Sequence, residues 1–260
     1  PTPELPAPAP ESPTAGPTPV PPVVDPVCRV RCLRRIGRGH AARFARGGAA
    51  GELAAADRVL GLAQRSSPVG DPGRAALLAE RGGILVAWTG HGGGAGTATE
   101  AVRVLREALA QTADEDPALA RRRLLFAEAL RRRWAAGGAA CDLHEAEWTL
   151  HRAARAAPDR VTAARAWLER GEVLRDLVRD ADAAESLRRA AGAAQDARLW
   201  LLAARARHQL GAILQRCGDR AGATTAFRAA QTLWWRGGVV RGPDAAATDD
   251  RLRRLTGGLP

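Results

Sequence analysis

Apolar side chains recur along this chain at the three- and four-residue intervals of an α-helix. From about residue 50 to residue 256, segments with this period alternate with breaks rich in glycine or aspartate. The helix formers Ala, Leu, Arg and Glu dominate, whereas β-branched and aromatic residues are scarce. The pattern predicts an all-α domain over residues 50–256.

One motif returns five times within these segments. It consists of an alanine, a leucine or phenylalanine four residues later, and a second alanine three residues beyond that. These offsets place two small residues around a large one on a single helix face, which lets the helix lie close against a neighbour. The five copies are Ala56–Leu60–Ala63, Ala101–Leu105–Ala108, Ala146–Leu150–Ala153, Ala183–Leu187–Ala190 and Ala223–Phe227–Ala230.

A second helical pattern precedes the last three copies. It contains Leu124, Ala127 and Leu130 in the first case. In the other two it contains Gly171 and Gly211, each inside an otherwise helical run, where glycine costs about 1 kcal/mol relative to alanine. Close packing against a paired helix would compensate, so we expect Gly211 to lie near Phe227. The paired helices predict antiparallel hairpins that stack into an α-solenoid.

These residues resemble the tetratricopeptide repeat (TPR) family. Trp167, Gly171 and Leu174, followed by the fourth copy of the motif, match the family's two-helix pattern, and the fifth unit matches it better still. The resemblance is strongest over residues 159–235, moderate over 117–158 and weakest over 50–116. Successive motifs are 45, 45, 37 and 40 residues apart. These spacings exceed the family's usual ~34 residues, which implies longer helices or loops, as in extended-repeat bacterial members.

The resemblance implies a concave groove lined by the first helix of each hairpin, where a partner protein or peptide binds. The lysines and asparagines that some members use to clamp a terminal carboxylate are absent. The implied groove positions are Arg121, Glu128, Arg131 and Arg132 in the third unit, Arg165, Leu168, Glu172, Arg175 and Asp176 in the fourth, and Arg205, His208, Gln215 and Arg216 in the fifth.

Charge suggests what that groove would hold. All 39 basic residues are arginine, and with 28 acidic residues the net charge is +11. Because the arginine fork binds carboxylates in a bidentate manner, we expect an interaction scaffold or regulatory module that binds an acidic segment of a partner. We take Arg131, Arg175 and Arg216 to be equivalent positions on successive helices. The alternative is nucleic-acid association, which is weaker because few aromatic side chains are available for base stacking.

The N-terminal fifth of the chain has a different character. Residues 1–27 contain eleven prolines and predict a disordered linker. Residues 28–49 form a basic lead-in, rich in arginine and broken by Gly37 and Gly39, whose structure the pattern leaves open. At the other end, Trp234 and Trp235 either cap the solenoid or anchor a partner.

Other chemistry finds little support. Residues 84–97 could form a strand and a phosphate loop, but the chain has no lysine, and a loop joining two helices is the favoured interpretation. Cys28, Cys32, Cys141 and His144 lack the spacing of a zinc site, so we expect buried cysteines in a reducing cytoplasm. Neither a membrane-spanning run nor a nucleophile–base motif is present in the sequence, and we expect no cofactor and no enzyme activity.

Overall fold

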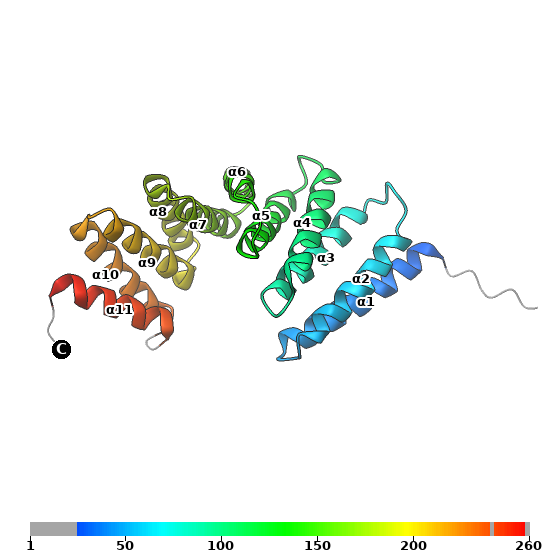
Figure 1. The fold of residues 1–260 in the computed structure, drawn as a ribbon, viewed down its shortest axis with the longest axis horizontal. Coiled ribbons are helices and arrows are strands. Elements are labelled where there is room, and N and C mark those ends of the chain that lie inside the picture. Colours follow the sequence, from blue (N-terminus) through cyan, green and yellow to red (C-terminus); the bar gives the residue numbers. More distant parts are fainter. Residues whose placement is uncertain (1–24, 240–241, 258–260) are drawn as a thin grey trace, which may run out of the picture.

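The structure is a computed structural model that describes residues 25–239 and 242–257. The described residues form eleven α-helices and no strand (Figure 1). The helices are α1 (Pro26–Ala45), α2 (Gly51–Ser66), α3 (Arg74–Thr89), α4 (Ala95–Ala110), α5 (Leu119–Ala135), α6 (Cys141–Arg155), α7 (Arg160–Asp176), α8 (Asp180–Asp196), α9 (Trp200–Arg216), α10 (Arg220–Arg236) and α11 (Pro243–Thr256).

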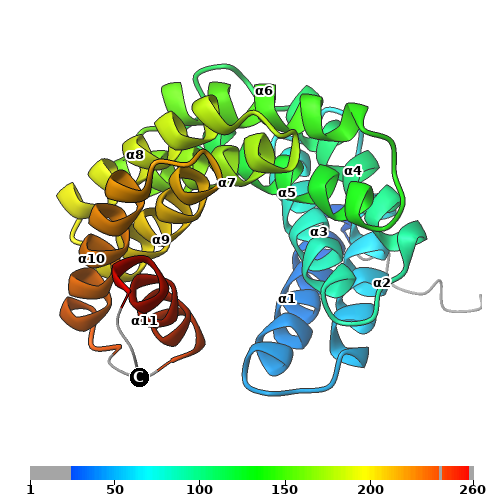
Figure 2. The same cartoon turned by 60° about the vertical axis from the view of Figure 1, so that its left-hand side comes forward.

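Ten of these helices form five consecutive antiparallel hairpins, from hairpin 1 (α1–α2) to hairpin 5 (α9–α10). Figure 2 shows an open arc in which the odd-numbered helices form the inner row and the even-numbered helices the outer row. Along the inner row, α3 contacts α5, α5 contacts α7 and α7 contacts α9. The predicted α-solenoid is therefore confirmed, and its concave face is built from first helices.

Each hairpin closes where a small residue of the first helix meets a large residue of the second. A methyl group added at Gly211 would lie 2.9 Å from the Phe227 ring, which confirms the contact expected from the sequence. The same substitution at Gly171 would approach Leu187 to 2.7 Å, and at Gly82 it would approach Leu105 to 2.4 Å. The helical glycines thus create the close approach that offsets their poor helix propensity.

The hairpins come in two lengths. From the small residue to its large partner the chain advances twenty-three positions in hairpin 1 (Gly37 to Leu60) and in hairpin 2 (Gly82 to Leu105). It advances only sixteen positions in hairpins 4 (Gly171 to Leu187) and 5 (Gly211 to Phe227). Hairpin 3 follows the long pattern, with the fully buried Ala127 and Leu150 in these places.

The hairpin tips explain this difference. Long tips contain two glycines: Gly137 adopts φ +94°, and a methyl group on the following Gly138 would lie 2.7 Å from the Arg133 carbonyl oxygen. Glycine pairs occupy the corresponding places at residues 47–48 and 92–93. Short tips need a single left-handed residue, Val178 (φ 59°) or Gly218 (φ 83°). The two spacings of 45 residues therefore reflect the long tips of hairpins 2 and 3, whereas the spacings of 37 and 40 residues cross the short tips of hairpins 4 and 5, so their excess over an ordinary repeat lies outside the tips.

The N-terminal boundary differs from the expected one. Asp25 caps α1, its carboxylate accepting a hydrogen bond from the Val27 amide at 3.1 Å, and Pro26 occupies the first turn. Most of the basic lead-in at 28–49 is thus the first helix of hairpin 1, and the helical array begins at residue 26 instead of residue 50. This arginine-rich helix is stabilised by ion pairs to the next hairpin, which Arg34 and Arg38 form with Glu80. The disordered linker was predicted over 1–27, but Asp25 caps α1 and Pro26 and Val27 belong to it, so the prediction is wrong for these three residues. The rest of the predicted linker, residues 1–24, lies outside the described residues.

The C-terminal end is covered by α11. Thr248, fully buried on this helix, accepts a hydrogen bond from the Trp234 indole at 3.1 Å and lies 2.8 Å from Nδ1 of His208. Trp234 therefore packs inside the cap, whereas Trp235 is 72% exposed. Of the two tryptophans only Trp234 contributes to capping, and a partner-anchoring role for Trp235 stays a prediction.

Candidate ligand groove on the concave face

The small residue of each first helix provides a common origin for comparing positions along the concave face. Six residues before Ala127, Gly171 and Gly211 lie Arg121, Arg165 and Arg205 respectively. We call these three side chains the arginine row. They occupy the N-terminal halves of α5, α7 and α9, and all three are exposed.

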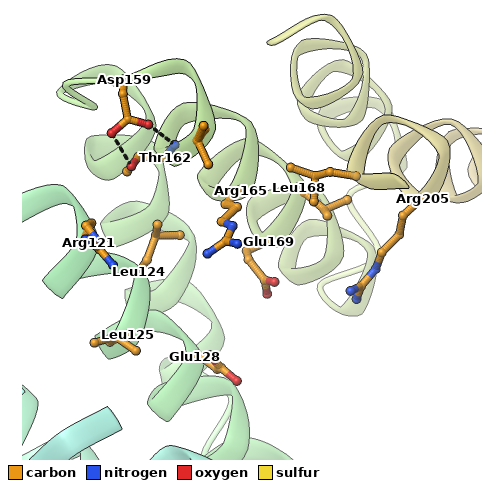
Figure 3. Close-up of a pocket in the computed structure, with 12 residues that line it drawn as sticks. Arg121, Leu124, Leu125, Glu128, Asp159, Thr162, Arg165, Leu168, Glu169 and Arg205 are labelled. Atoms are coloured by element: carbon orange, nitrogen blue, oxygen red, sulfur yellow. Dashed lines mark hydrogen bonds between the residues drawn. The ribbon is translucent and has the colours of Figure 1, made fainter. Parts of the chain in front are cut away.

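The arginine row borders the concave groove, a cavity of about 770 Å³ shown in Figure 3. Its apolar part comes from all three inner helices, and its rim also carries three carboxylates. A partner segment could therefore bury apolar area and form charge-assisted hydrogen bonds in one place. The lining residues are Arg121, Leu124, Leu125, Glu128, Asp159, Val161, Thr162, Arg165, Leu168, Glu169, Leu202 and Arg205.

The two classes of charge in the groove differ in their partners. Arg121 and Arg165 form no ion pair with any residue that the structure describes. The acidic side chains are already engaged: Asp159 caps α7 through the Thr162 amide at 2.7 Å, and Glu169 accepts a hydrogen bond from Arg131 at 2.6 Å. The groove therefore presents unsatisfied positive charge to a ligand, although its lining contains equal numbers of arginines and carboxylates.

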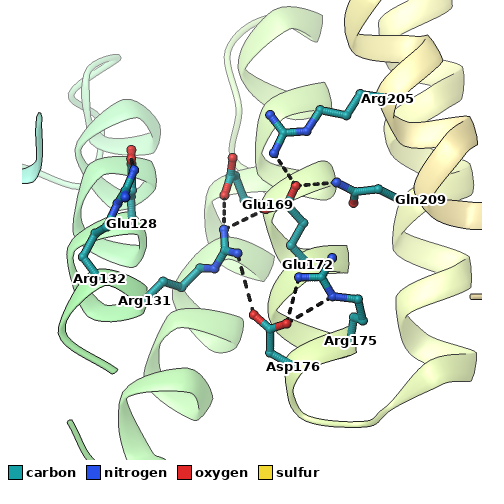
Figure 4. Close-up of polar contacts among 9 residues, drawn as sticks. All are labelled: Glu128, Arg131, Arg132, Glu169, Glu172, Arg175, Asp176, Arg205 and Gln209. Atoms are coloured by element: carbon teal, nitrogen blue, oxygen red, sulfur yellow. Dashed lines mark hydrogen bonds and ion pairs between the residues drawn. The ribbon is translucent and has the colours of Figure 1, made fainter. Parts of the chain in front are cut away.

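Deeper along the same helices the charges satisfy one another, as Figure 4 shows. Glu172 is 5% exposed and accepts hydrogen bonds from Arg205 at 2.6 Å, Gln209 at 2.6 Å and Arg131 at 2.9 Å. Arg131 also approaches Asp176 to 3.7 Å. This ionic seam, centred on Arg131 and Glu172, joins α5, α7 and α9 beneath the groove and leaves little positive charge for a ligand.

Burial acts differently on the two glutamates of the seam. It raises the pKa of Glu169, and the neighbouring charge of Glu172 raises it further. Burial also acts to raise the pKa of Glu172, but the Gln209 hydrogen bond and the charges of Arg131 and Arg205 outweigh it, so this pKa is lowered. Glu172 is therefore the carboxylate held in its charged form.

The remaining predicted groove residues are dispersed or already paired. Arg132 pairs with Glu128 on its own helix at 3.5 Å, and Arg175 pairs with its neighbour Asp176 at 2.8 Å. His208 and Gln215 contact α11, through Thr248 and Arg251 respectively. Of the thirteen predicted positions, the groove contains Arg121, Glu128, Arg165, Leu168 and Arg205.

The expected equivalence of Arg131, Arg175 and Arg216 is wrong. Arg131 and Arg175 lie four positions after the small residue of their own first helix. Arg216 lies five positions after Gly211, so the residue of α9 that is equivalent to them is Gln215. Arg216 instead pairs with Asp180 at the start of α8. The true row of equivalent arginines lies on the other half of the helices, and its signal in the sequence was the six-residue offset before the small residue.

Two other expectations about candidate sites need correction. All four cysteines are exposed, where burial was expected, because Cys28 and Cys32 lie at exposed positions of α1, while Cys141 and Cys217 lie at hairpin tips. Residues 84–89 belong to α3 and form no strand, and residues 90–94 join α3 to α4. Within the described ranges, no three metal-binding side chains gather into a site, and no described helix is long and apolar enough to cross a bilayer.

Comparison with solved structures supports the fold. The MamA protein matches at 16% identity, with a TM-score of 0.58, over 81% of this chain and 94% of that one. TTC0263, a thermophilic TPR protein of Thermus thermophilus, matches at 19% identity with a TM-score of 0.51, over 87% and 98%. BtubC from P. vanneervenii matches at 15% identity with a TM-score of 0.51, over 91% and 94%. No family model and no curated protein matches the chain. The chain thus has the fold of a TPR solenoid.

Proposed function

We propose that this protein is a non-enzymatic scaffold or regulatory module that binds an acidic segment of a partner protein in the concave groove. The observation that carries the proposal is the pair Arg121 and Arg165, two exposed guanidinium groups that lack an ion-pair partner among the described residues and border an apolar surface. Elsewhere on the concave face, the ionic seam shows that this chain pairs its own arginines where it can.

The spacing of the arginine row defines the segment further. Axes of packed helices lie about 8–10 Å apart, so neighbouring arginines of the row are separated by about that distance along the arc. A polyproline-II segment places every third side chain on one face at about 9 Å intervals, and an α-helix places every seventh at about 10 Å. Carboxylates repeated at either interval would meet Arg121 and Arg165 together.

The compartment that fits the molecule is the reducing cytoplasm. All four thiols are exposed and unpaired. Exposed thiols oxidise readily in secretory compartments, where small disulfide-stabilised domains prevail. This part of the proposal rests on the cysteines alone.

The test is a pulldown from the source lysate with mass spectrometry. The bait is the wild type or the double variant Arg121→Ala/Arg165→Ala. Charge-assisted hydrogen bonds in a partly desolvated groove are worth about 1.5–3 kcal/mol each, so the double variant should lose its partners or bind them at least about tenfold more weakly.

The matched control is Arg155→Ala/Arg228→Ala, which removes the same charge from exposed positions on the outer helices α6 and α10. Equal recovery of partners by both double variants would contradict the groove assignment. The nucleic-acid alternative predicts a third pattern: both variants weaken binding of a single-stranded oligonucleotide alike, with affinity that falls log-linearly with salt.

A further inference from the structure

A second cavity adjoins the concave groove at the turn between α8 and α9. It has a volume of about 370 Å³, and two of its lining residues, Arg165 and Leu202, also line the groove. We call it the anchor pocket. Its lining residues are Arg165, Arg198, Leu199, Trp200, Leu201, Leu202 and Gly237.

The local structure explains why this pocket is open. Arg198 adopts φ 56°, and this left-handed residue ends the α8 turn and sends the chain into α9. Gly237 follows α10, and a methyl group added there would lie only 2.4 Å from a terminal carbon of Leu201. The absence of a side chain at residue 237 lets Leu201 rest against the end of α10, and Leu201 remains 44% exposed.

The charges around the pocket have one sign. Arg165 and Arg198 line it and form no ion pair within the described part of the chain. Arg236 adds a third guanidinium group, 5.9 Å from the centre of the Trp200 ring. No acidic side chain is among the lining residues. The pocket therefore combines an apolar interior with a purely basic rim, unlike the mixed rim of the groove.

We infer that the anchor pocket binds a bulky apolar side chain, aromatic or branched aliphatic, of the same acidic segment that occupies the arginine row. This inference rests on the proposed function. Because Arg165 lines both cavities, the apolar residue lies within a few positions of a carboxylate in the bound segment. The partner's segment is thus recognised by a combination of negative charge and one anchoring side chain, and either one alone binds weakly.

The experiment uses a phage-displayed library of random dodecapeptides, selected against the full chain. The wild type should enrich peptides that contain Asp or Glu together with one bulky apolar residue at a constant distance from it. In synthetic peptides made from these sequences, replacing that apolar residue by alanine should weaken binding about tenfold or more, since a buried Leu or Phe side chain contributes that much.

Two variants separate the apolar from the acidic part of the selected motif. Gly237→Leu fills the anchor pocket by displacing Leu201, and should select peptides that keep the acidic residues and lose the apolar one. Arg121→Ala/Arg165→Ala should lose the acidic preference. The control is Gly192→Leu on α8, where an added Cβ atom would meet nothing within 4 Å. Circular dichroism of each variant checks that it folds.

The possible results are distinguishable. Wild-type enrichment of acidic peptides without an apolar preference, or an unchanged motif on Gly237→Leu, overturns the anchor pocket and leaves the proposed function standing. Failure of the wild type to enrich acidic peptides at all overturns the proposed function and this inference with it. Binding of a second copy of the chain at this pocket would appear as a dimer in analytical ultracentrifugation that Gly237→Leu disrupts, and would also contradict it.

Discussion

Hairpins 1–3 and hairpins 4–5 build the same helix-to-helix contact at two lengths. In hairpin 2 the contact joins Gly82 and Leu105, and in hairpin 5 it joins Gly211 and Phe227, with seven fewer residues between the partners. A helix turns once in about 3.6 residues, so seven residues add about one turn on each side of an antiparallel hairpin. Both helices therefore keep the same faces in contact. Hairpin length therefore varies by about one helical turn on each side of the tip.

The two tip types also distribute glycine differently. Long tips contain two glycines, as at Gly137 and Gly138. The first adopts a left-handed φ, and the second leaves room for a backbone carbonyl group of the preceding helix turn. Short tips manage with one left-handed residue, and hairpin 4 even uses Val178 there. The long tips are thus held by glycine geometry, while the short tips tolerate a strained side chain.

The largest effect is expected from changing the length of a tip. In hairpin 3, replacing residues 131–143 by the six residues RDLVRD, copied from 175–180, removes seven positions and should preserve the Ala127–Leu150 contact. A five-residue insert, RDLRD, removes eight and rotates α6 by about 100°. The second variant should be less stable than the first by about 2–5 kcal/mol, because Leu150 leaves the core. Urea unfolding monitored by circular dichroism measures the difference, and equal stability would refute the turn-by-turn explanation.

The ionic seam connects the two regions, because Arg131 belongs to hairpin 3 while Glu172 and Arg205 belong to hairpins 4 and 5. Glu172→Gln should cost about 2–3 kcal/mol at neutral pH, since it removes the buried charge that accepts hydrogen bonds from Arg131 and from the exposed Arg205. The pKa of Glu172 is lowered on folding, so its stabilisation is present above the unfolded value of about 4.3 and is lost as pH falls through the folded value. The cost should therefore disappear in strong acid. Chemical unfolding at several pH values tests this.

Glu169 provides the opposite case within the same seam. Its pKa is raised on folding, so its contribution to stability is complete below the unfolded value and is lost as pH rises through the folded value. Glu169→Gln should consequently be neutral or slightly stabilising at pH 7, in contrast to Glu172→Gln. A large destabilisation at neutral pH would show that the charge of Glu169, and its bond to Arg131, matters more than its burial.

Glycines inside helices offer a comparison at smaller scale. Gly211→Leu should overpack the Phe227 contact and cost about 1–3 kcal/mol. Gly192→Ala is the matched change at a helical glycine with open space around it, and should stabilise the protein by about 1 kcal/mol through helix propensity. The opposite signs, read from thermal or urea unfolding, distinguish contact glycines from incidental ones. Destabilisation by both would mean that helical context alone governs the effect.

The smallest effect concerns the short tips. Val178 and Gly218 occupy equivalent left-handed positions in hairpins 4 and 5. Val178→Gly should stabilise the protein by about 0.5–1 kcal/mol, because the relief of a β-branched side chain at positive φ exceeds the entropy cost of glycine. Gly218→Val should lower the free energy of unfolding by a similar amount. Urea unfolding measures both effects, and if the two substitutions change the free energy of unfolding in the same direction, the two short tips do not share a conformation.

Much of the fold was predictable from the sequence because its signals are local. The alanine–leucine (or phenylalanine) motif defines one helix face in every hairpin, and the sequence alone matches Gly211 to Phe227. The pattern did not predict the first helix of hairpin 1, because α1 carries six arginines and its apolar face is short. Pairing of Arg34 and Arg38 with Glu80, which lies on the next hairpin, is a tertiary effect that helical periodicity does not show.

The candidate site was less predictable for a related reason. The sequence suggested inner-row arginines in general, but which of them stay unpaired depends on neighbours on other helices. The sequence pattern favours Arg131, which lies in the seam, over Arg121 and Arg165, which border the groove. No pattern in the sequence indicates the anchor pocket, because the pocket depends on a contact between Gly237, which follows α10, and Leu201 on α9.

The arc of hairpins also has a mechanical consequence. Each hairpin packs mainly on its neighbours. Small rotations at successive interfaces therefore add up along the arc and change the distance between α1 and α11. Occupying a groove built across α5, α7 and α9 would change the curvature at the middle and move the ends. The exposed thiols of Cys32, on α1, and Cys217, at the tip of hairpin 5, lie in the first and last hairpins, so spin labels placed there would report the bending directly.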